Sequence, residues 1–144
     1  MQGFFDDKNK EYIIKNMKPR RPWLNYLWNE NVVCMSDQFG NGFSRMAIGT
    51  QRRDIEKGVR NVYIRDRTTG EAYSATRNYG DLPFDVHETH VGINYQRVIS
   101  GYNGLEVILT ICVPNDDAVV LYNVKIINKR GDNRLIDGYF CINP

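Results

Sequence analysis

His87 and His90 are the only histidines of the sequence, and they enclose Glu88 in a short His-Glu-Thr-His run. Imidazole and carboxylate groups this close together could bind a metal ion or transfer protons. The surrounding residues, however, have the pattern of a strand, on which side chains three positions apart point to opposite faces. We therefore expect Glu88 and His90 to share one face, favour a structural role for the run, and predict no metal site.

Two acidic pairs, Asp6-Asp7 and Asp116-Asp117, could in principle provide general acid and base catalysis. Both pairs lie next to expected turns, where aspartate is common because its carboxylate accepts hydrogen bonds from nearby backbone N–H groups. Glycoside chemistry instead needs two carboxylates that face each other across a cleft. Nothing in the sequence selects such a pair, so we predict no catalytic residue in this chain.

Trp23, Tyr26 and Trp28 lie within six residues of one another, shortly after the rigid residues Pro19 and Pro22. Flat rings with a polar edge suit the faces of sugars, and they also suit packing against another domain. Because large rings contribute mainly through the apolar area that they bury, the packing interpretation is favoured.

The composition is that of a globular domain, with 42% hydrophobic and 25% charged residues among 144. A chain of this length can bury roughly two-thirds of its unfolded surface, so one domain over residues 1–144 is expected. Nineteen basic and seventeen acidic residues give a net charge of +2. This small charge does not favour nucleic acid or an anionic membrane as a partner, and the apolar runs are far shorter than the ~20 residues of a membrane-spanning helix.

The three cysteines, Cys34, Cys112 and Cys141, are far apart and odd in number, and no C-x-x-C spacing occurs. This pattern predicts buried free thiols in a reducing compartment. The acidic start of the chain also differs from the basic start of a secretory signal peptide. Both features predict a cytoplasmic protein.

Apolar and polar residues alternate with a period of two, which predicts β-structure almost throughout. In the C-terminal half the alternation predicts four strands, at about 93–100, 105–113, 118–128 and 135–142. Asn103-Gly104 predicts a tight hairpin turn between the first two, and the short spacing predicts that all four pair as an antiparallel meander. The shorter strand candidates of the N-terminal half are 12–14, 32–36, 43–48, 61–66 and 71–76.

Helical periodicity is weak, because the closest approach to it, at residues 22–29, is too short for a helix without tertiary support. Residues 78–83 are rich in turn formers and predict a loop. A single antiparallel β-sandwich of the all-β class explains this pattern. Only Asn143 and Pro144 follow the last strand, so we expect an exposed sheet edge in a chain that forms part of a larger domain.

Several segments, in order along the chain, resemble the motifs of one family. They are Gly3 to Ile14 (similar to G-Y-F-D-D-x-N-R-E-Y-V-I), Pro22-Trp23-Leu24-Asn25-Tyr26-Leu27 (P-W-x-N-Y-L), Phe39 to Ser44 (G-G-Y-S), Tyr63-Ile64-Arg65-Asp66 (Y-I-R-D), His90 to Tyr95 (H-G-L-G-Y) and Asn103-Gly104-Leu105-Glu106 (N-G-I-E). The family is that of cellobiose phosphorylase, glycoside hydrolase family 94, formerly glycosyltransferase family 36. The chain departs from its motifs after Gly42 and at Trp28, which leaves the disaccharide open: cellobiose, chitobiose, laminaribiose and β-1,2-oligoglucans all fit.

The resemblance implies a galactose-mutarotase-like supersandwich, a large antiparallel β-sandwich that precedes a helical linker and an (α/α)6 barrel. Members of the family phosphorolyse β-linked disaccharides or short oligosaccharides with inversion. Inorganic phosphate is the co-substrate, the product is a sugar 1-phosphate, and no other cofactor is expected. The catalytic aspartate and most phosphate ligands belong to the barrel. The chain is therefore expected to be the non-catalytic N-terminal fragment of a phosphorylase, without turnover of its own.

The resemblance also implies that this region packs on the barrel, contributes to a homodimer and walls the active-site cleft across the subunit boundary. The candidate residues for that wall are Trp23, Tyr26, Trp28, Arg65 and His90, and core or turn packing is the competing interpretation of each. An alternative function is a free-standing sugar-binding module, in which Trp23 and Trp28 form a stacking platform. A third is an independent hydrolase, which would release reducing sugar.

Overall fold

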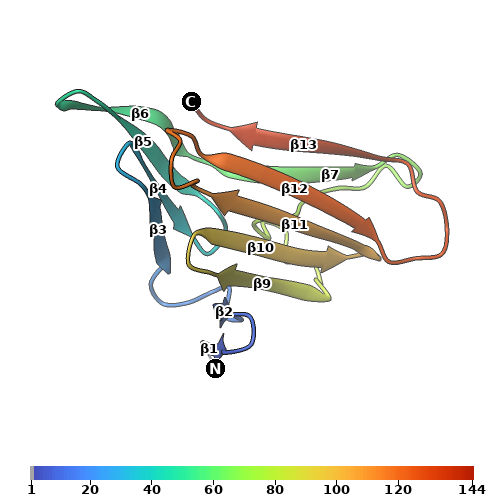
Figure 1. Cartoon of the computed structure of the whole chain (residues 1–144). Coiled ribbons are helices and arrows are strands. Elements are labelled where there is room, and N and C mark those ends of the chain that lie inside the picture. Colours follow the sequence, from blue (N-terminus) through green and yellow to red (C-terminus); the bar gives the residue numbers. More distant parts are fainter. Residues whose placement is uncertain (1) are drawn as a thin grey trace.

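The computed structural model describes residues 2–144, which form thirteen strands in three antiparallel sheets (Figure 1). The largest sheet has six strands in the order β1-β2-β9-β10-β11-β12. Their bounds are β1 Gly3–Asp6, β2 Glu11–Ile14, β9 Val86–Val91, β10 Tyr95–Tyr102, β11 Leu105–Cys112 and β12 Leu121–Asn128. The predicted all-β class is confirmed.

The two smaller sheets are built mainly from the middle of the chain. One has the order β3-β4-β5-β6, and the other the order β13-β7-β8. Their bounds are β3 Leu24–Trp28, β4 Val32–Asp37, β5 Gly42–Ile48, β6 Gln51–Gly58, β7 Arg60–Asp66, β8 Ala72–Ser74 and β13 Ile136–Ile142. Consecutive strands β6 and β7 belong to different sheets, and the chain bends between them at Gly58, whose φ is 100°. This left-handed backbone favours glycine.

The hairpin between β10 and β11 is the best-defined local feature of the sequence. Asn103 and Gly104 have φ angles of 50° and 76°, the left-handed values that a two-residue hairpin turn requires. Tyr102 and Leu105 close the turn, and pairing continues without interruption to Tyr95 and Cys112. The predicted hairpin is therefore confirmed, with its first strand starting two residues later than expected.

The predicted four-strand meander is wrong at its last strand. β13 pairs along its whole length with β7, in another sheet, and not with β12. Figure 1 shows the chain leaving β12 and crossing over to lie beside β7. The crossing covers the partly buried inner side of β12, where the rings of Tyr122 and Phe140 lie 5.3 Å apart. The apolar side chains of β12 are covered by a second layer rather than by extension of their own sheet.

Three strands and two of the three cysteines differ from the expectations. The segment 22–29, the closest approach to a helix, contains strand β3, and the polar strand β6 and short strand β1 were not expected. Of the cysteines, Cys34 is buried, Cys112 is half-buried and Cys141 is exposed, so only the first fits the predicted buried thiol. Cys141 is exposed because β13 is an edge strand whose last residues face solvent.

The hydrophobic core lies between the sheets. The alternating residues of β11 are buried, as the pattern predicted: Leu105, Val107, Leu109 and Ile111, followed by Val113 just after the strand. Across from them lie buried residues of the two smaller sheets, including Leu27, Cys34, Val62 and Ile64. Within residues 2–144, no helix is long and apolar enough to cross a membrane.

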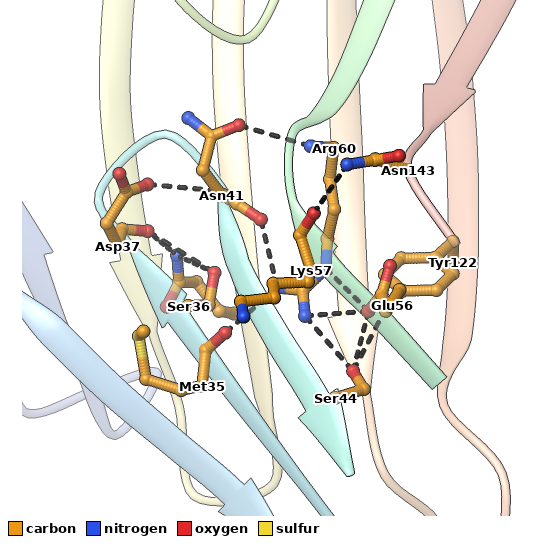
Figure 2. Close-up of polar contacts among 12 residues, drawn as sticks. Met35, Ser36, Asp37, Asn41, Ser44, Glu56, Lys57, Arg60, Tyr122 and Asn143 are labelled. Atoms are coloured by element: carbon orange, nitrogen blue, oxygen red, sulfur yellow. Dashed lines mark hydrogen bonds and ion pairs between the residues drawn. The ribbon is translucent and has the colours of Figure 1, made fainter. Parts of the chain in front are cut away.

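A buried ion pair lies within this core (Figure 2). The side chains of Arg60 and Glu56 are 1% and 3% exposed, and the Arg60 Nε donates to Glu56 Oε1 at 2.7 Å. Ser44 Oγ donates to the same carboxylate oxygen at 2.6 Å, and Tyr122 adds a further hydrogen bond to it. These four residues come from β7, β6, β5 and β12, so one polar cluster joins all three sheets.

The two terminal nitrogens of the Arg60 guanidinium also have partners, and its Nη2 donates to Ser44 Oγ at 3.0 Å. Its Nη1 donates to the carbonyl oxygens of Met35 at 2.9 Å and Gly40 at 3.1 Å. Burial alone would raise the pKa of Glu56, but the hydrogen bonds from Arg60, Ser44 and Tyr122 outweigh it and lower that pKa. The buried pair is therefore fully charged, and its stability depends on both partners being present.

Replacing one member of this pair is expected to be far more damaging than replacing both. Glu56→Leu leaves a buried, unpaired guanidinium and should lower the free energy of unfolding by about 3–5 kcal/mol. The double variant Glu56→Leu/Arg60→Met removes both charges and should recover most of that loss. Urea denaturation followed by tryptophan fluorescence measures each value.

The exposed pair of Arg45 and Asp54 provides the matched control. Its side chains are nearly half exposed, so Asp54→Ala should cost less than about 1 kcal/mol. A Glu56→Leu variant as stable as Asp54→Ala, or a double variant less stable than Glu56→Leu, would contradict the role assigned to the buried pair.

The burial of His87 predicts that the free energy of unfolding depends on pH. It packs edge-on against Phe84, with ring centroids 4.9 Å apart, and burial lowers its pKa below 6.5. As the pH falls below 6.5 the unfolded chain takes up this proton before the folded chain, so the free energy of unfolding decreases. Urea midpoints at pH 7.5, 6.5 and 5.5 should fall more steeply for the native chain than for His87→Gln. Parallel curves would show that His87 is not the titrating group.

Candidate functional site

Strand β3 carries an exposed aromatic face. Leu24, Tyr26 and Trp28 alternate along the strand, so they share one face, and they are 55%, 55% and 71% exposed. The intervening residue Leu27 is buried in the core. The sheet thus directs its aromatic residues to solvent here, in contrast to the usual inward orientation.

The same face continues across the neighbouring strands. Tyr26 is paired with Met35 of β4, which is in turn paired with Phe43 of β5. The guanidinium of Arg45 lies 4.5 Å from the centroid of the Phe43 ring. Met35 and Phe43 are half-buried, so the exposed part of this face consists of the β3 side chains, and exposed apolar patches of this kind are typical of interaction surfaces. We call these residues, Leu24, Tyr26, Trp28, Met35 and Phe43, the aromatic face.

Trp23 belongs to a different surface. It precedes β3, its ring centroid lies 5.4 Å from that of Tyr12, and its backbone N–H donates to Gln38 at 3.2 Å. Together with Asn25 and Gln96 these residues line a small cavity of about 180 Å³. The predicted platform of Trp23 and Trp28 is therefore divided between a cavity and the aromatic face.

The cavity offers hydrogen-bonding groups rather than reacting groups. The Asn25 Nδ2 atom is buried without a hydrogen-bond partner, and the Gln96 Nε2 donates to Ser36 Oγ at 3.1 Å. Asp37 also lines the cavity, and burial raises the pKa of its carboxyl group. Its Oδ1, however, accepts the backbone N–H groups of Phe39 and Asn41, at 2.8 and 2.9 Å. This carboxylate therefore shapes the turn after β4.

His90 lies in a charged cluster on the outer side of the six-stranded sheet. Its Nδ1 is 2.8 Å from Glu11 Oε2, and its Nε2 is 2.8 Å from Glu88 Oε1. The contact with Glu88 confirms that these residues share a strand face, whereas His87 points to the other side. Arg97 pairs with Glu11, so the cluster joins β2, β9 and β10.

The carboxylates of this cluster are held ionised. Burial raises the pKa of Glu11, but hydrogen bonds from Tyr95, His90 and Arg97 outweigh burial and lower it. The pKa of Glu88 is lowered in the same way, with Lys15 and His90 as the counteracting partners. A general acid for glycoside cleavage needs a raised pKa, which these groups lack. The cluster is suited to fixing strands rather than to donating protons.

Arg65 lies away from the other predicted residues. It is an exposed residue of β7, paired with Ala72 of β8 and Asp137 of β13, on the outer side of the three-stranded sheet. The five predicted residues therefore occupy four separate places: the aromatic face, the cavity, the charged cluster and the outside of β7. Of the five, only Tyr26 and Trp28 lie on one surface.

Turn chemistry accounts for one of the acidic pairs. The Asp6 carboxylate accepts the backbone N–H groups of Lys8 and Asn9, at 3.1 and 3.3 Å. In the described part of the chain, no group of three or more His, Cys, Asp or Glu side chains is placed to hold a metal ion. The predictions from sequence missed Arg60, although it shares the alternation of Val62 and Ile64 and so had to point inward. They also missed Glu11, whose partners lie far away in sequence.

Comparison with known proteins agrees with this architecture. The family model described as Glycosyl hydrolase 94, supersandwich domain, matches residues 10–143. The N,N'-diacetylchitobiose phosphorylase of Vibrio furnissii is 25% identical over 150 residues, which cover 95% of this chain and 18% of the relative. The solabiose phosphorylase of Paenibacillus borealis is 28% identical over 151 residues, which cover 96% and 20%. The chain spans about a fifth of the length of these curated relatives.

The matched region includes every strand from β2 to β13 in full, and with them the aromatic face, the cavity and the buried ion pair. The predicted resemblance is thereby confirmed, and the chain belongs to the glycosyl hydrolase 94 supersandwich-domain family.

Proposed function

We propose that this chain is the non-catalytic N-terminal β-sandwich region of an inverting phosphorylase that acts on a β-linked disaccharide. The observation that supports this most directly is the family match over residues 10–143, together with relatives named as phosphorylases. The ionised, internally paired state of Glu11, Glu56 and Glu88 agrees with a structural role.

The aromatic face gives this region a surface with which to perform that role. Tyr26 and Trp28 expose large apolar rings that a neighbouring domain would cover with a gain of free energy. In the proposed protein the covering partner is the (α/α)6 barrel, or the second subunit of a homodimer whose active-site cleft this face helps to wall. The barrel supplies the catalytic acid and the phosphate-binding groups, and the whole protein acts in the cytoplasm with inorganic phosphate as co-substrate.

A sugar-binding module is the second candidate, and one observation favours it. Tyr26 and Trp28 stand two residues apart on the same exposed face, an arrangement on which successive rings of a sugar chain can stack. This differs from the platform first expected, because Trp23 lines the separate cavity. The two candidates differ in whether the chain binds sugar by itself.

Turnover is expected only from the full-length protein. The reading frame beyond Pro144 should encode a helical barrel. The complete product, given phosphate and N,N'-diacetylchitobiose, solabiose or cellobiose, should release a sugar 1-phosphate from one of them. Residues 1–144 alone should release none, because the acid and the phosphate pocket are supplied by the barrel. A full-length protein that phosphorolyses no β-linked disaccharide, or an active 144-residue chain, would overturn the proposal.

Titration with oligosaccharides separates the scaffold from the module. As a scaffold, the 144-residue chain should show no saturable change of tryptophan fluorescence with chito- or gluco-oligosaccharides. As a module, it should show saturable binding that Trp28→Ala abolishes. Trp23→Ala is the matched control, because it removes a tryptophan from the cavity and leaves the aromatic face intact.

A further inference from the structure

The outer edge of β6 is an open sheet edge that the C-terminal end of the described chain already contacts at one point. β6 is the last strand of its sheet, and from Gln51 to Ile55 its side chains are exposed. At its far end, the backbone N–H of Lys57 donates to the carbonyl oxygen of Asn143 at 2.9 Å. The Asn143 Nδ2 donates back to the Lys57 carbonyl oxygen at 3.0 Å. Figure 2 shows the bond from the Asn143 side chain to the Lys57 carbonyl oxygen.

The path of the chain explains this contact. β13 runs antiparallel to β7 and ends with Ile142 paired with Arg60. Since β6 and β7 are consecutive and bend at Gly58, the next residue after Ile142 reaches the edge of β6 instead of β7. In Figure 1 the C-terminal end of β13 lies close to β6. One backbone bond and one side-chain bond thus hold Asn143 against the outer edge of β6, with the chain running antiparallel to that strand.

An apolar slot lies beside the same edge. It has a volume of about 300 Å³, and its walls are mainly apolar: Met46, Ile55, Val119, Val120, Tyr122 and Ile142. Ile55 and Ile142 are 41% and 43% exposed, so apolar surface remains uncovered where the sheets meet. Glu56 also lines this slot, and its Oε2 atom is buried without a hydrogen-bond partner.

We propose that the outer edge of β6 binds an extended segment of the parent chain that lies beyond Pro144, running antiparallel to β6 and placing an apolar side chain in the slot. This inference rests on the proposed function, since it requires a parent chain of the length of the relatives. Pro144 has no backbone N–H, and its position tolerates this lack. In the continued ladder it lies opposite Glu56, whose own N–H faces β5, so no hydrogen bond from residue 144 is needed there. Arg52 and Arg53 favour acidic residues on the arriving segment.

Engineered disulfides in the full-length protein test the pairing directly. Antiparallel pairing from Lys57 and Asn143 brings Arg53 opposite the third residue after Pro144, and the irregular register at Ser44 and Arg45 can shift this by one. Arg53→Cys is therefore combined with a cysteine at the second, third or fourth residue after Pro144. All of these variants also carry the substitutions Cys112→Ser and Cys141→Ser. One of the three combinations should form an intramolecular disulfide under mild oxidation, detected by mass spectrometry.

The control replaces Arg53→Cys with Arg65→Cys, an exposed position on the outside of the other sheet, which should not cross-link. The backbone amides of β6 between Gln51 and Ile55 that face away from β5 should also exchange with deuterium about ten-fold or more slowly in the full-length protein than in the 144-residue chain. Equal exchange in the two proteins, absence of the intramolecular cross-link, or a cross-link between two copies would overturn the proposal. Phosphorolysis by the same full-length preparation is measured separately, so that the pairing on β6 and the proposed phosphorylase function can each be refuted without the other.

Discussion

The buried pair of Glu56 and Arg60 is the constraint on which the arrangement of the sheets depends. The two residues stand four positions apart, on either side of the bend at Gly58, where the chain passes from one sheet into another. Both side chains nevertheless point into the core and meet there. Charges this deeply buried are tolerated only when paired and hydrogen-bonded, so the bend, the pair and the contact with Tyr122 stabilise one another.

The sequence predicts local structure well wherever one face of a strand is buried. Alternation located β10, β11 and β12 within a few residues, and Asn103-Gly104 defined their first turn, because both features depend on neighbouring residues alone. Pairing between distant strands is a different matter. The alternation of β13 shows which of its faces is apolar, but not whether it extends a sheet or covers one. β6 has no apolar alternation at all, since most of its side chains face solvent.

For the candidate site residues, too, the sequence predicts what depends on neighbouring residues and misses contacts with distant ones. Side chains two residues apart on a strand share a face, and this rule would have separated Trp23 from Tyr26 and Trp28. The same rule correctly placed Glu88 and His90 on one face of β9. What this rule cannot supply is a partner far away in the chain. The contact of His90 with Glu11 spans 79 residues, and it turns a pair of groups that could bind a ligand into a closed charge cluster.

The division of labour proposed for the parent protein follows from how this chain uses its charges. A general acid for glycoside cleavage must hold its proton near neutral pH, which requires burial without a cation beside it. The buried glutamates here have the opposite surroundings: Glu56 faces Arg60 and Glu11 faces Arg97, so burial is outweighed and both stay ionised. Such carboxylates stabilise a scaffold. In the proposed protein, the part of this chain left to contact another domain is the exposed pair of rings of Tyr26 and Trp28, and proton transfer belongs to that other domain.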